Sequence, residues 1–332
     1  MENMVHSTGG TIVEVMAKDP LGRPILASYG ILGDRKTVII ELAQASGLPL
    51  LEGNERNPLI TTSFGTGELL KHALDGGYRS FVIGLGGSAT NDGGMGLLKA
   101  LGVAFYDKDG NELPQGGEAL NRLASIDDTR LDVRVRESVF MIASDVTNPL
   151  YGPNGASAVF GPQKGASPNM VAILDRGLQQ WSRVIYEQKG IDVQCMPGSG
   201  AAGGAGAALL AFLHAELKPG IDIVMESIQF ERHIKNADAI ITGEGKLDQQ
   251  TLSGKVIAGV CKKASRLQIP VIALCGGYEL SIEEMDALGL SAAFSIVPRP
   301  CSLEEAIKQT KEWSQGQVEQ IFRVLGLKES TL

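Results

Sequence analysis

Short apolar runs alternate with helix-length stretches through the C-terminal third of the chain. Residues 239–242, 270–274 and 292–297 have the composition of buried strands, and the stretch 254–267 between the first two has helical character. Parallel strands need a crossover connection, which is usually a helix. The alternation therefore predicts a parallel sheet and places the chain in the α/β class.

The N-terminal part also predicts strands, here joined by tight turns. Residues 11–15 and 37–41 are β-type runs, and turn-forming residues lie between them at 19–22. Farther along, apolar residues at helical spacing over 69–74 precede the buried run 80–85. We expect a helix that leads into a strand ending in glycines.

The length of 332 residues corresponds to about two domains of roughly 150 residues each. The predicted domains are a mixed α/β domain with glycine-rich turns over residues 1–218 and a second α/β domain over residues 219–332.

Composition excludes several classes of partner and site. The formal charge is −8 with no Lys/Arg-rich cluster, so we expect no nucleic-acid partner. Four cysteines and four histidines are scattered without the spacing of a zinc site or a disulfide framework. The start lacks a basic and apolar leader, and no apolar run is long enough to span a bilayer, so we expect a cytoplasmic protein without membrane contact. A homo-oligomer is compatible with the sequence.

The C-terminal stretch predicts a helix. Ser302 and Glu305 have the spacing of a capping box. The apolar residues that share one face of this helix are Val318, Ile321, Phe322 and Leu325. We expect that face to pack against a core.

A glycine-rich turn at 86–96 follows the strand-like run 80–85 and precedes a helical pattern. Backbone N–H groups at such a turn can hold an anion, because glycine permits close approach and a helix N-terminus carries partial positive charge. Asp92 could hold an accompanying cation, or the turn could be purely structural with Asp92 as its cap. The candidate residues for this anion site are Gly86, Gly87, Ser88, Thr90, Asn91 and Asp92.

Two further candidates follow the apolar run 139–143. Asp145 comes directly after it, where loops of α/β proteins commonly hold ligands, and could act as a base or a Mg²⁺ ligand. Lys164, in a Gly/Pro-rich loop, offers a mobile positive charge for a phosphate or carboxylate. The alternatives are an Asx-type turn at Asp145 and an ordinary surface lysine at Lys164.

The segment 242–251 presents charged residues on alternate positions after a predicted strand. Gly243 and Gly245 precede the charged residues, and Lys246 would meet a phosphate. Glu244 and Asp248 are the candidate Mg²⁺ ligands. The alternative is a solvated loop before the next helix.

Two common sequence fingerprints of nucleotide-binding proteins are the P-loop and the dinucleotide motif G-x-G-x-x-G. No P-loop sequence occurs in the chain. Residues 198–203 match G-x-G-x-x-G, but Pro197 fits the dinucleotide fingerprint poorly. Close helix packing through the glycines is the favoured explanation of that segment.

Six blocks along the chain together resemble the bacterial glycerate kinase family of the glycerate 2-kinase type. They occur in the family's order and extend over nearly the whole chain. The blocks are TSFGTGEL at 62–69, GGSATNDGG at 86–94, SDVTNPL at 144–150, AVFGPQKGA at 158–166, GGAG at 203–206 and TGEGKLD at 242–248.

The resemblance implies ATP-dependent phosphorylation of D-glycerate with Mg²⁺, most simply at the 2-hydroxyl. It also implies a flavodoxin-like parallel-sheet domain, which we assign to residues 219–332. Within this scheme the turn at 86–96 and the segment 242–248, with Gly243 and Gly245, bind MgATP. The catalytic candidates are Asp145, Lys164 and Lys246, and Arg299 is the candidate for the glycerate carboxylate.

The chain departs from the family at its start. Family members open with a strand and a D-S-F-K motif, followed by A-D-G-G-E-G-T before the block matched here by residues 8–14. We therefore expect the flavodoxin-like domain to lack its N-terminal part. The alternative function is an inactive homologue that still binds nucleotide or a small organic acid.

Overall fold

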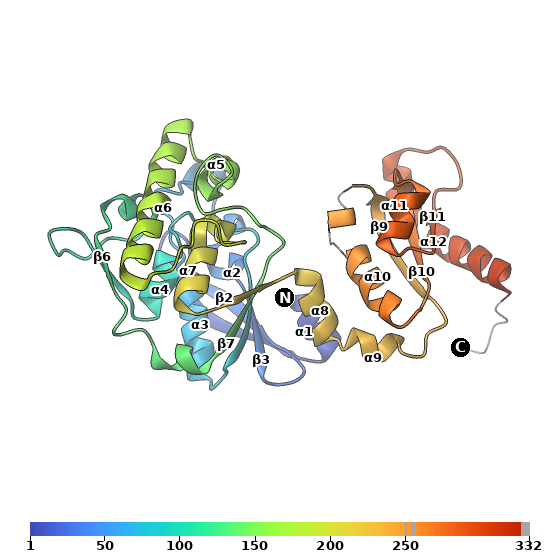
Figure 1. The fold of residues 1–332 in the computed structure, drawn as a ribbon, viewed down its shortest axis with the longest axis horizontal. Helices are drawn as coiled ribbons and strands as arrows, with labels where there is room; N and C mark the ends of the chain where they lie inside the picture. Colours follow the sequence, from blue (N-terminus) through green and yellow to red (C-terminus); the bar gives the residue numbers. More distant parts are fainter. Residues whose placement is uncertain (250, 254–255, 327–332) are drawn as a thin grey trace. The chain divides into compact units, whose positions relative to one another are not determined.

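The computed structural model describes residues 1–249, 251–253 and 256–326 (Figure 1). The chain divides into two compact units, Met1–Ile223 and Val224–Leu332, and each is described by itself. Both combine helices with sheets, so the predicted α/β class is confirmed. The predicted domain boundary at residue 218 stays a prediction.

A six-stranded mixed sheet forms the centre of unit 1. Its order is β1-β2-β3-β4-β7-β8, with antiparallel pairing from β1 to β3 and parallel pairing from β3 to β8. The strands are β1 (Thr11–Lys18), β2 (Pro24–Ile31), β3 (Thr37–Glu41), β4 (Ser80–Gly84), β7 (Val139–Ala143) and β8 (Glu216–Lys218). The strands expected at 11–15, 37–41 and 80–85 are therefore confirmed.

Alternate side chains of the central strands face two different cores. On β4, Phe81 and Ile83 belong to the larger core, while Val82 belongs to a smaller core on the other face of the sheet. Phe81 stacks on Phe140 of β7, with ring centroids 5.0 Å apart. Because successive side chains of a strand point to opposite faces, a strand buried on both sides needs the continuous apolar run found here.

Helices pack on both faces of this sheet, and a short hairpin lies outside it. The hairpin consists of β5 (Ala104–Tyr106) and β6 (Ser125–Asp127). The helices are α1 (Glu2–Thr8), α2 (Ala43–Ser46), α3 (Phe64–Asp75), α4 (Met95–Ala100), α5 (Ala156–Phe160), α6 (Pro168–Lys189), α7 (Ala205–Phe212) and α8 (Gly220–Ser227), the last crossing the division between the units.

The parallel strands of unit 1 place their carboxyl ends along one edge of the sheet. Glu41, Gly84 and Ala143 end β3, β4 and β7 and are neighbours in register. The segments that follow β4 and β7 consequently leave the sheet side by side. Ligand sites of open α/β sheets lie at this edge.

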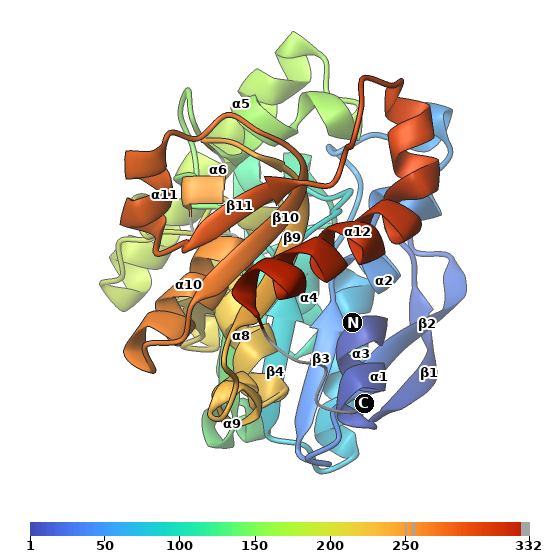
Figure 2. The ribbon, with the colours of Figure 1, turned by 90° about the vertical axis from the view of Figure 1, so that its right-hand side faces the viewer.

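Unit 2 contains a three-stranded parallel sheet in the order β11-β10-β9, as the alternation of strands and helices predicts. Helix α12 lies across one side of this sheet (Figure 2). The elements are α9 (Phe230–Ile234), β9 (Ile240–Leu247), α10 (Val256–Arg266), β10 (Val271–Tyr278), α11 (Ile282–Leu288), β11 (Ala292–Ser295) and α12 (Leu303–Leu325).

The prediction of a charged loop after residue 242 is wrong, because β9 continues through this segment to Leu247. The segment pairs with β10, where Gly243 is in register with Leu274 and Lys246 with Gly277. Backbone pairing along this stretch extends the strand although glycine has no intrinsic preference for one.

The C-terminal helix is present, but the packing expected for it is only partly right. Ser302 caps α12, since its side chain accepts a hydrogen bond from Glu305 N, but the Glu305 carboxylate pairs with Arg299 instead of completing the capping box. On the predicted core face Ile321 is buried, whereas Phe322 is 41% and Leu325 49% exposed. The spacing of apolar residues along a helix shows that they share one face, but it does not show that another element packs against that face.

Among the described residues, no helix combines the length and the apolar character that crossing a membrane requires.

Candidate functional site

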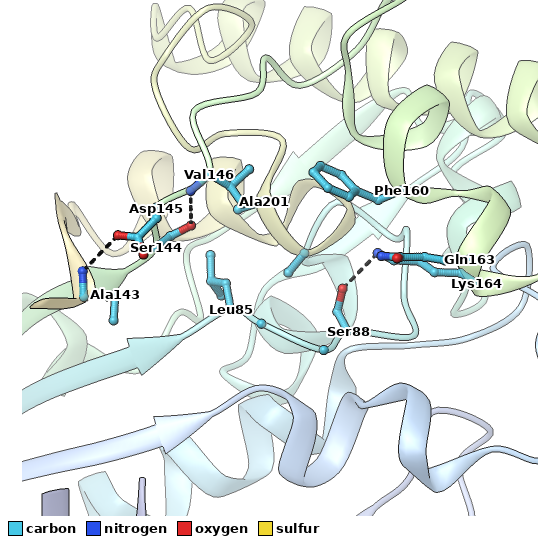
Figure 3. Close-up of a pocket in the computed structure, with 14 residues that line it drawn as sticks. Leu85, Ser88, Ala143, Ser144, Asp145, Val146, Phe160, Gln163, Lys164 and Ala201 are labelled. Atoms are coloured by element: carbon cyan, nitrogen blue, oxygen red, sulfur yellow. Dashed lines mark hydrogen bonds between the residues drawn. The ribbon is translucent and has the colours of Figure 1, made fainter. Parts of the chain in front are cut away.

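A pocket of about 370 Å³ lies in unit 1 at the carboxyl ends of β4 and β7 (Figure 3). Segments that are distant in sequence meet there. The lining residues are Leu85, Gly86, Gly87, Ser88, Ala143, Ser144, Asp145, Val146, Phe160, Gln163, Lys164, Ala201, Ala202 and Gly220.

The first half of the glycine-rich turn forms one wall of this pocket. Gly86 and Gly87 line it, and a Cβ built on Gly86 would meet nothing within 4 Å, so bare backbone borders open space there. Gly87 has φ +72°, a conformation that favours glycine. The turn thus gives a ligand close access to backbone groups.

The second half of the turn folds beneath the pocket. Thr90, Asn91 and Asp92 are fully buried and are not among the lining residues. The Asn91 amide donates to Ser157 Oγ at the start of α5, over 3.0 Å. These three predicted nucleotide-binding residues therefore lie behind the wall that a ligand would touch.

Asp92 ties the turn to neighbouring backbone. Its carboxylate accepts hydrogen bonds from Ser63 N (2.8 Å), Ser63 Oγ (2.9 Å), Gly94 N (3.0 Å) and Gly96 N (3.1 Å). Burial raises the pKa of Asp92, and these hydrogen bonds oppose the rise. The structural interpretation of Asp92 is the one that this geometry supports, because the carboxylate is already engaged by four donors.

Lys164 is held in place and is not a mobile surface charge. It ends the 3₁₀ helix η5 (Pro162–Lys164) and is 2% exposed. Its Nζ donates to Ser88 Oγ over 2.8 Å and to Thr90 O over 2.7 Å. Burial lowers the pKa of Lys164 to about 7, although the negative charge of Asp92 acts in the opposite direction. Both the mobile-charge prediction and the surface-lysine alternative are therefore wrong.

Asp145 enters the same pocket from the end of β7. It is exposed, and its Oδ1 accepts a hydrogen bond from Gly220 N at the start of α8 over 3.2 Å. Ser144 beside it accepts from Val146 N over 3.2 Å. The structure thus brings together Gly86, Gly87, Ser88, Asp145 and Lys164 among the predicted site residues.

The other candidates lie in unit 2. Gly243, Glu244 and Gly245 border a second pocket, of about 480 Å³, between the end of the sheet and α12. Glu244 accepts a hydrogen bond from Thr251 Oγ1. The Asp248 backbone N–H also donates to Thr251 Oγ1, over 3.1 Å.

Two of the unit 2 candidates are engaged in surface ion pairs. Lys246 Nζ lies 2.7 Å from Glu279, and the hydrogen bond to that carboxylate raises the pKa of Lys246. Arg299 pairs with Glu305 over 2.5 Å and is not among the residues that line the second pocket. Exposed pairs of this kind are easily exchanged for a ligand, because solvent and salt screen the attraction between the two charges.

Within the described ranges, no group of three or more His, Cys, Asp or Glu side chains could hold a metal ion by itself. Mg²⁺ usually binds one or two carboxylates together with substrate phosphates. Asp145 in the first pocket and Glu244 beside the second are compatible with that mode of binding.

The G-x-G-x-x-G segment serves close packing. A Cβ on Gly203 would lie 2.1 Å from Thr90 O, and Gly203 O accepts the hydrogen bond of Gly93 N over 3.0 Å. The segment therefore supports the glycine-rich turn from behind, while Ala201 and Ala202 reach the pocket.

Sequence reasoning missed Phe160, Gln163 and Ser144 as lining residues. All three lie in the blocks 144–150 and 158–166, which also contain the predicted site residues Asp145 and Lys164. Their position within those blocks was the available signal.

A family model described as the Glycerate kinase family matches residues 1–326. The chain belongs to the glycerate kinase family. The protein is accordingly a kinase, an enzyme that transfers a phosphoryl group.

Proteins named as glycerate kinases resemble this chain over most of its length. This chain is 46% identical to the glycerate kinase of Bacillus subtilis, in an alignment that covers 95% of this chain and 82% of that protein. It is 47% identical to the glycerate 2-kinase of Escherichia coli, covering 93% and 81%. The crystal structure of the putative glycerate kinase 2 from Salmonella typhimurium LT2 superposes with a TM-score of 0.85 at 46% identity, covering 98% of this chain and 85% of that one.

Proposed function

We propose that the protein transfers the γ-phosphoryl group of ATP to D-glycerate and forms 2-phosphoglycerate. The observation that carries this proposal is the unit 1 pocket, where bare glycine backbone, the Ser88–Lys164 pair and the Asp145 carboxylate face one space. The names of the relatives in Bacillus subtilis and Escherichia coli favour glycerate as acceptor.

The residues of the pocket suit the demands of phosphoryl transfer. Such enzymes act chiefly by positioning the reactants and by neutralising charge. Gly86 and Gly87 expose backbone to phosphate oxygens, and the Ser88 hydroxyl offers a hydrogen bond to an anionic or hydroxyl oxygen. We assign the reacting part of glycerate to the space between Ser88 and Asp145.

Mg²⁺ fits the carboxylates of this chain, and we propose it as the companion of ATP. Asp145 would hold it in unit 1, and Glu244 and Asp248 remain the proposed ligands in unit 2. When bound, the ion would supply neutralising charge for the phosphate oxygens. Gly243, Gly245 and Lys246 remain proposed contributors to nucleotide binding, and Arg299 to binding the glycerate carboxylate.

The test is to incubate the purified chain with D-glycerate and MgATP and to separate 2- from 3-phosphoglycerate by chromatography with mass-spectrometric detection. Circular dichroism first establishes that the chain is folded, and reactions without ATP or with L-glycerate serve as controls. We expect 2-phosphoglycerate that depends on both ATP and D-glycerate. Calorimetric binding of nucleotide or glycerate to a folded chain that forms no product would instead support the inactive homologue.

A further inference from the structure

The buried amine of Lys164 and the hydroxyl of Ser88 form a contact that positioning of phosphate alone does not explain. A lysine that binds phosphate usually keeps its ammonium group free to approach the ligand. Lys164 is instead 2% exposed and directs its Nζ at Ser88, as Figure 3 shows. Ser88 is 6% exposed and lines the pocket.

We propose that Lys164 and Ser88 form a proton relay that accepts the proton of the glycerate hydroxyl during transfer. This inference rests on the proposed function and deepens it. Ser88 is the residue that touches the substrate, and Lys164 acts through it as the terminal proton acceptor.

The hydrogen bonds of Lys164 allow this role once the amine is neutral. A neutral amine has two N–H groups and one lone pair. One N–H remains on Thr90 O, which lies 2.7 Å from Nζ, and the lone pair can accept the hydrogen of Ser88, whose Oγ lies 2.8 Å away. The Ser88 oxygen then has a lone pair available for the substrate hydroxyl.

The surroundings favour the neutral amine at physiological pH. Burial lowers the pKa of Lys164 to about 7, so near neutral pH a large fraction of the amine has lost its proton. The negative charge of Asp92, in the turn before α4, raises the pKa of Lys164, but burial has the larger effect. Asp92 is itself fully buried and accepts four hydrogen bonds. Asp145 lines the same pocket from the end of β7.

The step balances as follows. The glycerate hydroxyl proton moves to Ser88 Oγ as the Ser88 proton moves to Lys164 Nζ, which becomes an ammonium group. The glycerate oxygen forms a bond to the γ-phosphorus of ATP, and the bond between that phosphorus and the β–γ bridging oxygen breaks. ADP leaves with the electron pair, and Lys164 later releases its proton to water.

The experiment measures kcat and KM between pH 5.5 and 9.5 for the wild type and for Ser88→Ala, Ser88→Thr and Lys164→Met. We expect wild-type kcat/KM to rise with pH through an apparent pKa near 7, because only the neutral amine accepts a proton. Ser88→Ala should lower kcat by about 10²–10⁴-fold, change KM for glycerate far less and abolish the rise with pH. Ser88→Thr keeps the hydroxyl and should restore much of the activity.

When two residues act as a unit, the losses of activity caused by substituting each of them do not add. The double variant Ser88→Ala/Lys164→Met should therefore have a kcat no lower than that of Lys164→Met alone. Ser182→Ala matches Ser88 in exposure, at 6%, and lies in α6 outside this pocket. Lys108→Met removes an exposed lysine. Both control variants should retain wild-type kinetics.

A measurement without turnover guards against variants that do not fold. Chain labelled with ¹³Cε-lysine is titrated by NMR without substrate, and one lysine is expected to change near pH 7. Lysines that all titrate near the ordinary value of about 10.4 would overturn the relay. So would a wild-type enzyme whose rise with pH persists in Ser88→Ala, in which case the proposed function still stands. A wild type that forms no phosphoglycerate overturns the proposed function and the relay together.

Discussion

Gly86 is the residue whose substitution best separates ligand binding from folding. It lines the unit 1 pocket, a Cβ there would meet nothing within 4 Å, and its φ lies outside the left-handed region. Its neighbour Gly87 has φ +72°, and a Cβ on it would lie 3.3 Å from Ala43 Cβ. A side chain at Gly86 would therefore occupy the pocket, whereas a side chain at Gly87 would strain the backbone.

We predict that Gly86→Ala raises KM for ATP about tenfold, equivalent to about 1.4 kcal/mol, and changes the free energy of unfolding by less than about 0.5 kcal/mol. The added methyl group would fill space that phosphate oxygens need, without straining the backbone. Gly87→Ala should instead destabilise the fold by about 1–2 kcal/mol, since a side chain is disfavoured in the left-handed region. Steady-state kinetics and urea denaturation of both variants test this. An unchanged KM for ATP in folded Gly86→Ala would remove the turn from nucleotide binding.

At the scale of elements, the short segment that precedes α7 supports the glycine-rich turn. Gly203 has φ +66°, and a Cβ on it would lie 2.1 Å from Thr90 O, the atom that also accepts a hydrogen bond from Lys164. Trp181 of α6 reports on the same region, because its ring stacks on Phe212 of α7 and would lie 2.9 Å from a Cβ on Gly93. The α7 entry, the turn and Lys164 therefore depend on one packing arrangement.

We predict that Gly203→Ala lowers the free energy of unfolding of unit 1 by about 1–3 kcal/mol, since overpacking is added to an unfavourable backbone conformation. Urea denaturation followed by Trp181 fluorescence measures it in a Trp313→Phe background, because the chain has two tryptophans. Gly53→Ala is the matched control, since a Cβ there meets nothing within 4 Å. Equal midpoints for the Gly203→Ala and Gly53→Ala variants would contradict the packing argument.

The same elements show what the sequence could and could not predict. Local patterns were sufficient for β3, β4 and β10, because strands with buried residues on both faces require continuous apolar runs. They also located β11 and the first half of β9, which are less buried. They were insufficient for Lys164, whose partner Ser88 is 76 positions away, since burial of a lysine depends on tertiary packing. They also failed at Gly243 and Gly245, which lie within β9, because pairing of that strand with β10 outweighs the low strand preference of glycine.

At the scale of the whole molecule, the two units differ in how much core supports their sheets. In unit 1, β2, β3, β4 and β7 each have a neighbouring strand on both sides, whereas in the described part of unit 2 this is true of β10 alone. A large cluster of buried apolar side chains lies on one face of the unit 1 sheet, and a smaller cluster lies on the other face. Local opening costs more free energy where more apolar surface is buried, so the resistance to opening should differ between the units.

We predict that amide hydrogens of β4 exchange most slowly, those of β10 faster and those of the edge strand β9 fastest among the three. The side chains of Phe81, Val82 and Ile83 are all at most 1% exposed, whereas β9 has several exposed residues along its length. Hydrogen exchange followed by mass spectrometry at peptide resolution tests this order, with the urea-unfolded chain correcting for intrinsic rates. If β10 instead exchanged as slowly as β4, opening would be one cooperative event of the whole chain. The stability of the unit 1 pocket would then depend on unit 2 as much as on the sheet that carries it.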